Sequence, residues 1–373
     1  MKVVAAIDSF KGSMTSMEAG NAVKKGILAA KPDAEVWLSP LADGGEGTVD
    51  ALIEGLGAEK IPVTVAGPLG EKVSCYYGFL EETKTAVMEM ASAAGITLVI
   101  KKDPLRASTY GVGEMIADAL KRGCKNFMIG IGGSATNDGG IGMLKALGFE
   151  FFDEDGNDVG EGAAALAKIE VIRTENKNSL LSGAKFQIAC DVKNPLCGKQ
   201  GATYIFGPQK GVTGEQKSKV DEAMKHYADV TKESLGCDFA DCEGAGAAGG
   251  LGYAFLSYLA GELIPGVELI LQATGLEEKM KNADVVVTGE GRLDAQTVMG
   301  KAPVGVAALA KKYNAKVIAF AGSVAPEASV CNQAGIDAFF PIVRGVTTLE
   351  EAMKKENAME NIAATAEQVF RLL

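Results

Sequence analysis

The feature that most constrains the fold is a short, wholly apolar run followed by a polar turn and an amphipathic helical segment. Such runs occupy residues 3–7 near the amino terminus and residues 285–287 and 317–320 near the carboxyl terminus. Strands that are apolar throughout are typical of parallel sheets covered by helices on both faces. The pattern therefore predicts an α/β protein built on a doubly wound parallel sheet.

Helix signals between these runs support the same fold. Thr15 and Glu18 have the spacing of a capping box, and the apolar positions that follow them fall on one helical face until Pro32. A second strand at 35–39 and a second helix at 47–56 are expected next. Towards the carboxyl terminus, the predicted strands are 284–288, 316–321 and 338–343, and the predicted helices are 302–313 and 356–373.

The middle of the chain does not continue the pattern of apolar strands alternating with helices. Gly67-Pro68-Leu69-Gly70 interrupts the first pattern, and residues 73–80 and 85–90 then read as an antiparallel pair of strands. Because the parallel-sheet pattern returns only near the carboxyl terminus, we expect one α/β domain from residues 1–66 plus 283–373. Residues 67–282 would form a second, inserted α/β domain. Two domains in sequential order are the alternative.

Composition disfavours several partners and chemistries. The net charge of −11 argues against a nucleic acid or an anionic membrane surface as partner, and no apolar stretch approaches the length of a membrane span. The seven cysteines form no C-x-x-C pair, which is typical of reduced thiols and predicts a cytoplasmic protein. With His226 as the single histidine, zinc binding and a Ser-His-Asp mechanism are both disfavoured.

Polar, glycine-rich turns follow the predicted strands of the first domain. In open α/β sheets, ligands bind beyond the carboxyl ends of the strands. If these strands are parallel, the polar residues of their turns meet at one edge of the sheet. In the turn at 43–48 the alternative is that an acid only caps the following helix. The residues expected at this edge are Asp8, Ser9, Lys11, Asp43, Glu46, Thr48, Glu290, Arg292 and Asp294.

A second kind of glycine-rich turn occupies residues 130–140. It follows an apolar run and matches G-x-G-x-x-A, with Asp153 after the next run, so it meets the dinucleotide fingerprint superficially. With 47 glycines in the chain, this match is weak. The amides of 132–134 and the hydroxyls of Ser134 and Thr136 would suit a polyphosphate, and a packed strand–helix turn is the alternative. The run 244–252 could bind a nucleotide or simply allow close packing.

A third turn contains Asp191 and Asn194, and Pro195 stiffens it. Mg²⁺ prefers one or two carboxylates together with substrate phosphates, so Asp191 or the acids at 290 and 294 could hold it. Lys11 and the arginine at 292 can neutralise anionic oxygens. The chain has no P-loop motif and no H-R-D or D-F-G pair, so it is neither a P-loop protein nor a protein kinase.

Taken together, these runs resemble the signature runs of the bacterial glycerate kinases. The resemblance covers nearly the whole chain, and the runs occur in the order and spacing of that family: DSFKGS at 8–13, PLADGGEGT at 40–48, GIGGSATNDGG at 130–140, CDVKNPL at 190–196 and TGEG at 288–291. The resemblance implies ATP-dependent phosphorylation of D-glycerate, with the 2-hydroxyl and hence 2-phosphoglycerate favoured. It also implies a flavodoxin-like domain that carries a second α/β domain as an insertion.

On this hypothesis glycerate binds in a cleft between the domains of a monomer or homodimer, with its carboxylate on Lys11 or Arg292. Asp191 takes the hydroxyl proton or orients the hydroxyl, and Glu290 or Asp294 helps to hold Mg²⁺. The other residues expected to bind substrate are Asp8, Ser9, Asp43, Glu46, Thr48 and Asn194, and those expected to bind ATP are Gly132, Gly133, Ser134, Thr136, Asn137 and Asp138. The alternatives are a nicotinamide-dependent oxidoreductase of a small hydroxy acid and a non-catalytic sensor of a phosphometabolite.

Overall fold

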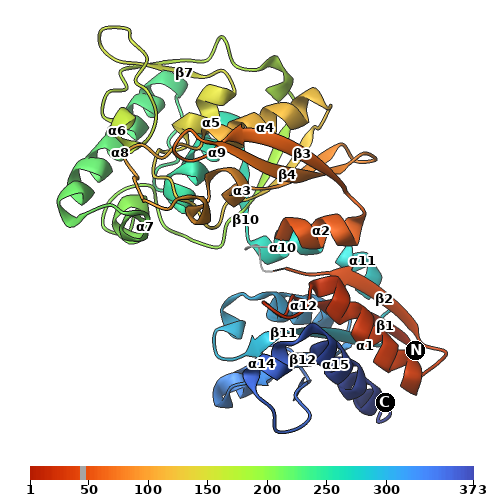
Figure 1. Ribbon diagram of the computed structural model, residues 1–373. Helices are drawn as coiled ribbons and strands as arrows, with labels where there is room; N and C mark the ends of the chain where they lie inside the picture. Colours follow the sequence, from red (N-terminus) through yellow and green to blue (C-terminus); the bar gives the residue numbers. More distant parts are fainter. Residues whose placement is uncertain (43–47) are drawn as a thin grey trace. The chain divides into compact units, whose positions relative to one another are not determined.

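The structure is a computed structural model of the 373-residue chain, and it describes residues 1–42 and 48–373 (Figure 1). Asp43 and Glu46 lie outside the described residues, and so does the side chain of Thr48. The chain divides into two compact units. Unit 1 is Met1–Asp43, Asp50–Gly57 and Val267–Leu373, and unit 2 is Gly44–Val49 and Ala58–Gly266. No helix in the described part of the chain is both long enough and apolar enough to span a bilayer.

Unit 1 contains a five-stranded sheet in the order β2-β1-β11-β12-β13, and every neighbouring pair is parallel. Numbered along the chain within the unit, this order is 2-1-3-4-5, which is the flavodoxin-like order. The predicted parallel α/β sheet is therefore confirmed. The strands are β1 (Lys2–Ile7), β2 (Glu35–Pro40), β11 (Val285–Leu293), β12 (Lys316–Val324) and β13 (Ala338–Pro341).

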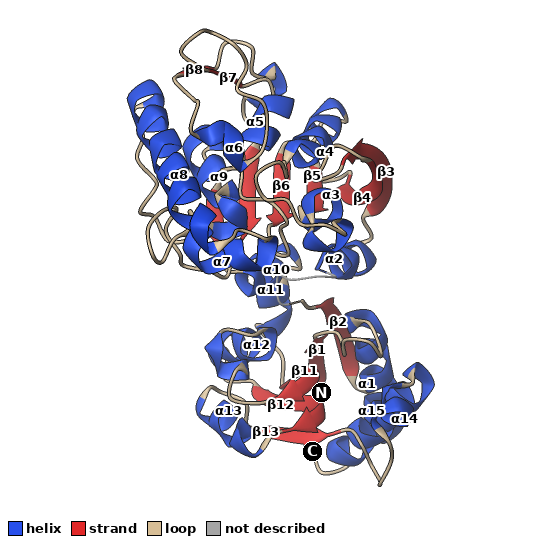
Figure 2. Ribbon diagram, turned by 60° about the vertical axis from the view of Figure 1, so that its left-hand side comes forward, coloured by secondary structure: helices blue, strands red, loops and turns tan. Residues whose placement is uncertain are grey.

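Helices cover both faces of this sheet. Figure 2 shows α1 (Ser16–Ala30) and α15 (Lys355–Phe370) on one face and α12 (Ala302–Lys311) on the other. The predicted capping box starts α1, since Glu18 N donates to Thr15 Oγ1 (3.2 Å) and Thr15 N donates to the Glu18 carboxylate (2.9 Å). The remaining helices are α2 (Thr48–Leu56), α10 (Gly266–Ala273), α11 (Leu276–Met280), α13 (Val330–Gln333) and α14 (Leu349–Met353), with 3₁₀ turns η4 (Thr297–Met299) and η5 (Pro326–Ser329).

Unit 2 contains a six-stranded mixed sheet in the order β10-β9-β6-β5-β4-β3. The predicted antiparallel pair is present as β4 and β5, and β5, β6, β9 and β10 run parallel to one another. The strands are β3 (Glu59–Ala66), β4 (Lys72–Leu80), β5 (Thr85–Glu89), β6 (Asn126–Gly130), β9 (Lys185–Ala189) and β10 (Glu262–Ile264). A separate antiparallel pair is formed by β7 (Glu150–Phe152) and β8 (Val171–Arg173).

The boundaries between the units differ from those expected from the sequence. Residues 59–66 were expected in the first domain, but β3 pairs with β4 along its whole length, from Glu59 opposite Phe79 to Ala66 opposite Lys72. Residues 267–282 were expected in the insertion, but they belong to unit 1. A strand goes with the sheet that completes its hydrogen bonds, and local sequence does not reveal that partner.

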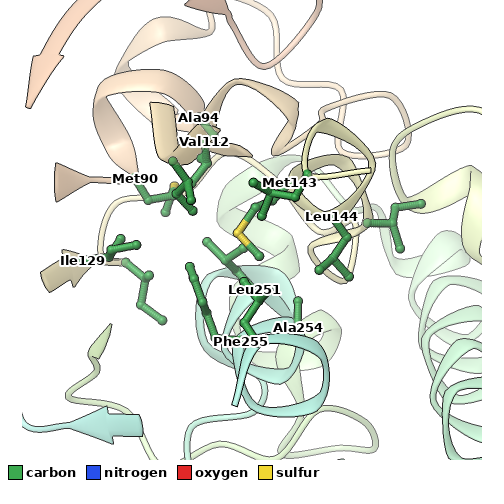
Figure 3. Close-up of a cluster of buried hydrophobic side chains, with 14 of the residues drawn as sticks. Met90, Ala94, Val112, Ile129, Met143, Leu144, Leu251, Ala254 and Phe255 are labelled. Atoms are coloured by element: carbon green, nitrogen blue, oxygen red, sulfur yellow. The ribbon is translucent and has the colours of Figure 1, made fainter. Parts of the chain in front are cut away.

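Helices of unit 2 pack around a core cluster that lies within this unit. Figure 3 shows part of this core, where residues from five elements and the adjoining segments converge: Met90, Ala94, Val112, Ile129, Met143, Leu144, Leu251, Ala254 and Phe255. The helices are α3 (Ala91–Ala94), α4 (Tyr110–Lys121), α5 (Ile141–Ala146), α6 (Ala163–Leu166), α7 (Ala202–Lys210), α8 (Gly214–Leu235) and α9 (Leu251–Leu259), with 3₁₀ turns η1 (Ile96–Leu98), η2 (Ser179–Leu181) and η3 (Ala247–Gly249).

Candidate functional site

A cavity of about 560 Å³ in unit 1, called here the unit 1 pocket, lies at the carboxyl ends of β1, β11, β12 and β13. This is the edge at which open α/β sheets bind ligands, and the order of the strands changes direction between β1 and β11. The pocket brings together most of the residues predicted for the first domain. They are Asp8, Ser9, Lys11, Glu290, Arg292 and Asp294.

The loop that follows β1 is a tight turn held by backbone hydrogen bonds and by two buried apolar side chains. Phe10 N donates to Met14 O (2.9 Å), and Ser13 N donates to Phe10 O (2.8 Å). The side chains of Phe10 and Met14 are buried, whereas Lys11 is exposed. Gly12 has a φ of +78°, a conformation that suits glycine. The turn therefore fixes the backbone on both sides of Lys11 while its side chain lines the pocket.

Glu290 is a buried carboxylate in the unit 1 pocket, with 8% of its surface exposed. Thr297 Oγ1 donates to Glu290 Oε1 (2.7 Å), and Lys301 Nζ lies 3.4 Å from Oε2. Burial raises the pKa of Glu290 above its usual value, while the hydrogen bond from Thr297 and the charge of Lys301 oppose that rise. The negative charge of Glu290 therefore depends on these two neighbours.

Asp294 lies in the same network of charges. Its carboxylate oxygens lie 3.6 Å from Arg292 Nε and 3.8 Å from Lys301 Nζ, and Gln296 N donates to Oδ1 (2.9 Å). Alternating carboxylates and cations of this kind suit a phosphate ester and its counter-ion. Within residues 1–42 and 48–373, no cluster of three or more His, Cys, Asp and Glu side chains has the arrangement of a metal site.

A second cavity, of about 220 Å³, lies in unit 2 and is called here the unit 2 pocket. It follows the carboxyl ends of β6 and β9, which are parallel and place Gly130 opposite Ala189. The register therefore brings the two turns that follow these strands side by side. Predicted residues from both turns line the pocket: Gly132, Gly133, Ser134 and Asp191.

Lys210, at the end of α7, also lines the unit 2 pocket although it is only 2% exposed. Its Nζ donates to the carbonyl oxygen of Thr136 (2.7 Å). Burial lowers the pKa of Lys210 to about 7, and the negative charge of Asp138 opposes this shift. No carboxylate of a described residue forms a salt bridge with Lys210. Among the described residues, this buried amine therefore has a carbonyl partner and a charged neighbour in Asp138, but no carboxylate in a salt bridge with it.

Asp191 is exposed and lies two residues after the end of β9, in the turn that lines the unit 2 pocket. Gly266 N donates to its Oδ1 (2.8 Å), which fixes the orientation of the carboxylate. Asn194, three residues further on, is directed elsewhere: its Nδ2 donates to Gln200 O (2.7 Å), and it is not among the described residues that line the pocket. Of the two polar residues predicted in this turn, Asp191 alone faces the cavity.

The second half of the 130–140 turn folds into the interior. Thr136, Asn137 and Asp138 are completely buried, and none is among the described residues that line the unit 2 pocket. The Asp138 carboxylate accepts hydrogen bonds from Thr109 N and Oγ1 and from the backbone N–H groups of residues 140 and 142. Burial raises its pKa, and these donors oppose the rise. In this structure Asp138 organises the loop behind the pocket.

The glycine run 244–252 packs tightly, which accounts for its composition. A Cβ at Gly249 would lie 2.2 Å from Thr136 O, and one at Gly246 would lie 2.2 Å from Pro195 O. Ala247 and Ala248 from this run line the unit 2 pocket. Ala248 has a φ of +52°, a strained conformation for a residue with a side chain. The glycines thus allow close packing that carries two alanines to the wall of the pocket.

Comparison with known proteins gives the family. A model of the glycerate kinase family matches residues 3–373 of the chain. The chain belongs to the glycerate kinase family. The resemblance seen in the five sequence runs is therefore confirmed.

Individual members of the glycerate kinase family match over nearly the full length. The glycerate kinase of Bacillus subtilis (strain 168) is 45% identical over 371 residues, covering 99% of this chain and 97% of that protein. The glycerate 2-kinase of Escherichia coli (strain K12) is 45% identical over 372 residues, covering 98% of each. A crystal structure described as a glycerate kinase 2 from Salmonella typhimurium LT2 superposes with a TM-score of 0.91 at 43% identity, covering 99% of this chain and 97% of that one.

Membership of the glycerate kinase family makes the protein an enzyme, a kinase that acts on a small molecule. It also implies a nucleotide as the second substrate. The oxidoreductase and sensor alternatives are thereby set aside. The G-x-G-x-x-A match at 130–135 lies in the turn after β6, and the following helix α5 begins only at Ile141.

Sequence reasoning missed Lys301 and Lys210, which line the two pockets. Lys301 directly precedes α12, and a polar residue between Gly300 and a helix is one available signal. Lys210 is the last residue of α7, whose other residues are mostly small or apolar, and nothing in its local sequence separates it from a solvated lysine. Its burial arises from packing between distant segments of unit 2, which a single sequence does not display.

Proposed function

We propose that the protein transfers the γ-phosphoryl group of ATP to the 2-hydroxyl of D-glycerate with the help of Mg²⁺. The observation that carries the proposal is the match over nearly the full chain to relatives named glycerate kinase and glycerate 2-kinase. In the reaction, the bond between the γ-phosphorus and the β–γ bridging oxygen breaks, and a bond forms to the hydroxyl oxygen. The hydroxyl proton leaves, and the products are ADP and 2-phosphoglycerate.

The unit 1 pocket supports the participation of a magnesium–phosphate group. Mg²⁺ in kinases is commonly held by one or two carboxylates plus phosphate oxygens, and Glu290 and Asp294 supply two carboxylates in one pocket. When bound there, the ion neutralises phosphate charge. Lys11, Arg292 and Lys301 offer charge to the remaining phosphate oxygens. Because Lys301 neighbours both acids, metal binding requires its ammonium to turn towards the phosphates.

Asp191 is our proposed proton acceptor. Its carboxylate lines the unit 2 pocket and is oriented by Gly266 N. A general base must be within hydrogen-bond reach of the proton that it takes, and a carboxylate is the available group because His226 lines neither pocket among the described residues. His226 instead contacts Ile169 O through Nε2 (2.8 Å).

The test is a phosphorylation assay with ATP, Mg²⁺ and D-glycerate, with the product resolved as 2- or 3-phosphoglycerate by ³¹P NMR. We expect 2-phosphoglycerate, no turnover after removal of the metal with EDTA, and recovery on addition of Mg²⁺. Asp191→Asn should lower kcat by roughly 10²–10³, by analogy with other preorganised polar groups. Glu243→Gln, an exposed acid paired with Lys193, is the matched control and should leave kcat unchanged.

Each outcome separates one part of the proposal. A product phosphorylated at the 3-position would contradict the regiochemistry and leave the kinase activity in place. Near-full turnover by Asp191→Asn would remove that residue as the base. Absence of phosphorylated glycerate with the wild-type enzyme would overturn the proposed function.

A further inference from the structure

The two pockets differ in size. The unit 1 pocket has a volume of about 560 Å³, and the unit 2 pocket has a volume of about 220 Å³. Sites for ligands of drug or cofactor size usually have volumes of about 300–1,000 Å³. The unit 1 pocket lies within this range, and the unit 2 pocket lies below it. Of the two substrates of the proposed reaction, the nucleotide is by far the larger.

The walls of the unit 1 pocket suit a nucleotide. The buried residues Phe10 and Ile342 line it, and Leu349 and Met353 of α14 add exposed apolar surface. A three-carbon acid has almost no apolar surface to bury against such a wall, whereas a nucleobase has two apolar faces. The charged network around Glu290 lies in the same pocket, so a base and a polyphosphate would both find partners there.

The unit 2 pocket suits a small anion that carries hydroxyl groups. Lys210 is buried and donates to Thr136 O, and no described carboxylate forms a salt bridge with it, although the charge of Asp138 acts on it. A buried ammonium without a salt-bridge partner is unfavourable, so an anion that enters the pocket gains a strong partner. Ser134 and Asp191 line the same pocket and can hydrogen-bond hydroxyl groups.

We propose that the hydroxy acid binds in the unit 2 pocket, with Lys210 as the counter-ion of its carboxylate, and that the nucleotide binds in the unit 1 pocket. The proposal rests on the proposed function and deepens it. It differs from the expectation from the sequence, which assigned the glycerate carboxylate to Lys11 or Arg292 and ATP to residues 132–134 and 136–138. It also assigns Asp191 and the acid to one pocket, as proton transfer from the hydroxyl requires.

The first arm of the test changes Lys210 and measures the KM for each substrate separately. Lys210→Met removes the charge, and Lys210→Gln removes the charge but retains a donor for Thr136 O. In both variants the KM for D-glycerate should rise about 10- to 100-fold, the worth of a hydrogen bond to a charged group, while the KM for ATP changes less than about two-fold. Lys225→Met, an exposed lysine of α8, is the matched control and should change neither.

A pH profile separates a binding role of Lys210 from a purely structural one. The titratable groups around this amine are Asp138, in the same loop as Thr136, and Asp191 and Cys190 in the same pocket. Because Lys210 loses its charge as the pH rises through about 7, the KM for D-glycerate should increase above that pH. In Lys210→Met this dependence should disappear, whereas a structural role would leave it in place.

The second arm changes the apolar wall of the unit 1 pocket. Met353→Ala shortens a lining side chain and should raise the KM for ATP about three- to ten-fold while leaving the KM for D-glycerate unchanged. Met299→Ala is the matched control, since Met299 is 81% exposed in the same unit and is not among the described residues that line the pocket.

The outcomes distinguish this proposal from the proposed function. Suppose that the wild-type enzyme turns over ATP and D-glycerate but the Lys210 variants change the KM for ATP alone. The assignment of the two substrates to the two pockets is then overturned, and the proposed kinase function stands. The same holds if Met353→Ala changes the KM for D-glycerate alone. If the wild-type enzyme shows no turnover, the function fails, and calorimetric titration of D-glycerate and of ADP into the same variants decides the assignment of the two pockets.

Discussion

Lys210 should also make the stability of unit 2 depend on pH. The unfolded chain holds the lysine proton up to the usual pKa of 10.5, whereas the folded chain releases it near pH 7 because the amine is buried. Between these values the unfolded state binds more protons, so the free energy of unfolding rises with pH by a few kcal/mol in total. Below about pH 7 both states are protonated, and the contribution of Lys210 to the free energy of unfolding is at its lowest.

Lys210→Met should remove this rise and stabilise the protein at neutral pH. The measurement is urea unfolding between pH 7 and 10, followed by the near-UV circular dichroism of the tyrosine cluster Tyr227, Tyr253 and Tyr258 in unit 2. Lys225→Met should retain the wild-type slope. An unchanged slope in Lys210→Met would show that another group titrates in this range.

Asp138 is the residue on which the 130–140 turn depends most. It is completely buried, and its carboxylate accepts hydrogen bonds from Thr109 and from two backbone N–H groups. Asp138→Asn replaces one acceptor oxygen by a donor that faces other donors, so we expect a loss of about 2–4 kcal/mol in the free energy of unfolding. Asp155→Asn, in an exposed loop, should change it by less than about 0.5 kcal/mol. Equal stability of the two variants in urea would contradict the role of Asp138.

For individual residues, the sequence predicts which side chains are chemically suited to a site better than it predicts which of them are buried. Asp8 and Lys11 were expected beyond the end of a strand at one edge of a parallel sheet, and both line the unit 1 pocket there. Asp138 was expected at the ligand, but the turn continues into the interior and the structure makes it a partner of backbone amides. The inward path is set by the close approach of the glycine run at 244–252, far away in the chain.

Among the elements, α1 and α15 approach each other so closely that the position of contact in α1 must be a glycine. A Cβ at Gly26 of α1 would lie 2.0 Å from the carbonyl oxygen of Ala363 in α15, which is rigid backbone. Gly26→Ala should therefore separate the helices and destabilise unit 1 by about 1–3 kcal/mol. Gly20→Ala in the same helix meets only Leu38 Cδ2 at 3.5 Å, so it should stabilise by about 0.5–1 kcal/mol through helix propensity.

Thermal unfolding of the two glycine variants, followed by the fluorescence of Trp37 in β2, gives the comparison. Trp37 is the single tryptophan of the chain and belongs to unit 1. The expected order of midpoints is Gly20→Ala, wild type, Gly26→Ala. If Gly26→Ala unfolds at the wild-type midpoint, the two helices have room to adapt and the tight contact is not required.

The elements themselves were largely predictable, but their partners were not. The capping box and the apolar runs gave the starts of α1 and of the parallel strands, because these signals are local. β11 was expected to end at residue 288, yet it continues to Leu293 because it keeps its pairing with β12 as far as Val324. That extension carries Glu290 and Arg292 on a strand instead of a loop, which no local pattern indicates.

At the scale of the whole molecule, the two units differ in how the chain builds them. Unit 2 is nearly continuous, since all but a short segment of it lies in Ala58–Gly266. Unit 1 is discontinuous: β1 pairs with β2 from the first part of the chain and with β11 from the last. Each unit has its own sheet and its own buried cluster. Separate cores are the condition under which a domain folds alone.

We therefore expect a fragment of residues 58–266 to fold without the rest of the chain, because its sheet and the core shown in Figure 3 are complete within it. It should give a helix-and-strand circular dichroism spectrum and a single cooperative transition in urea. A chain truncated after Gly266 should retain this unit but leave β1 and β2 without β11, β12 and β13. Limited proteolysis of that truncated chain should digest residues before 58 and spare the remainder. Digestion of the whole truncated chain at the same rate would show that unit 2 depends on unit 1 for its stability.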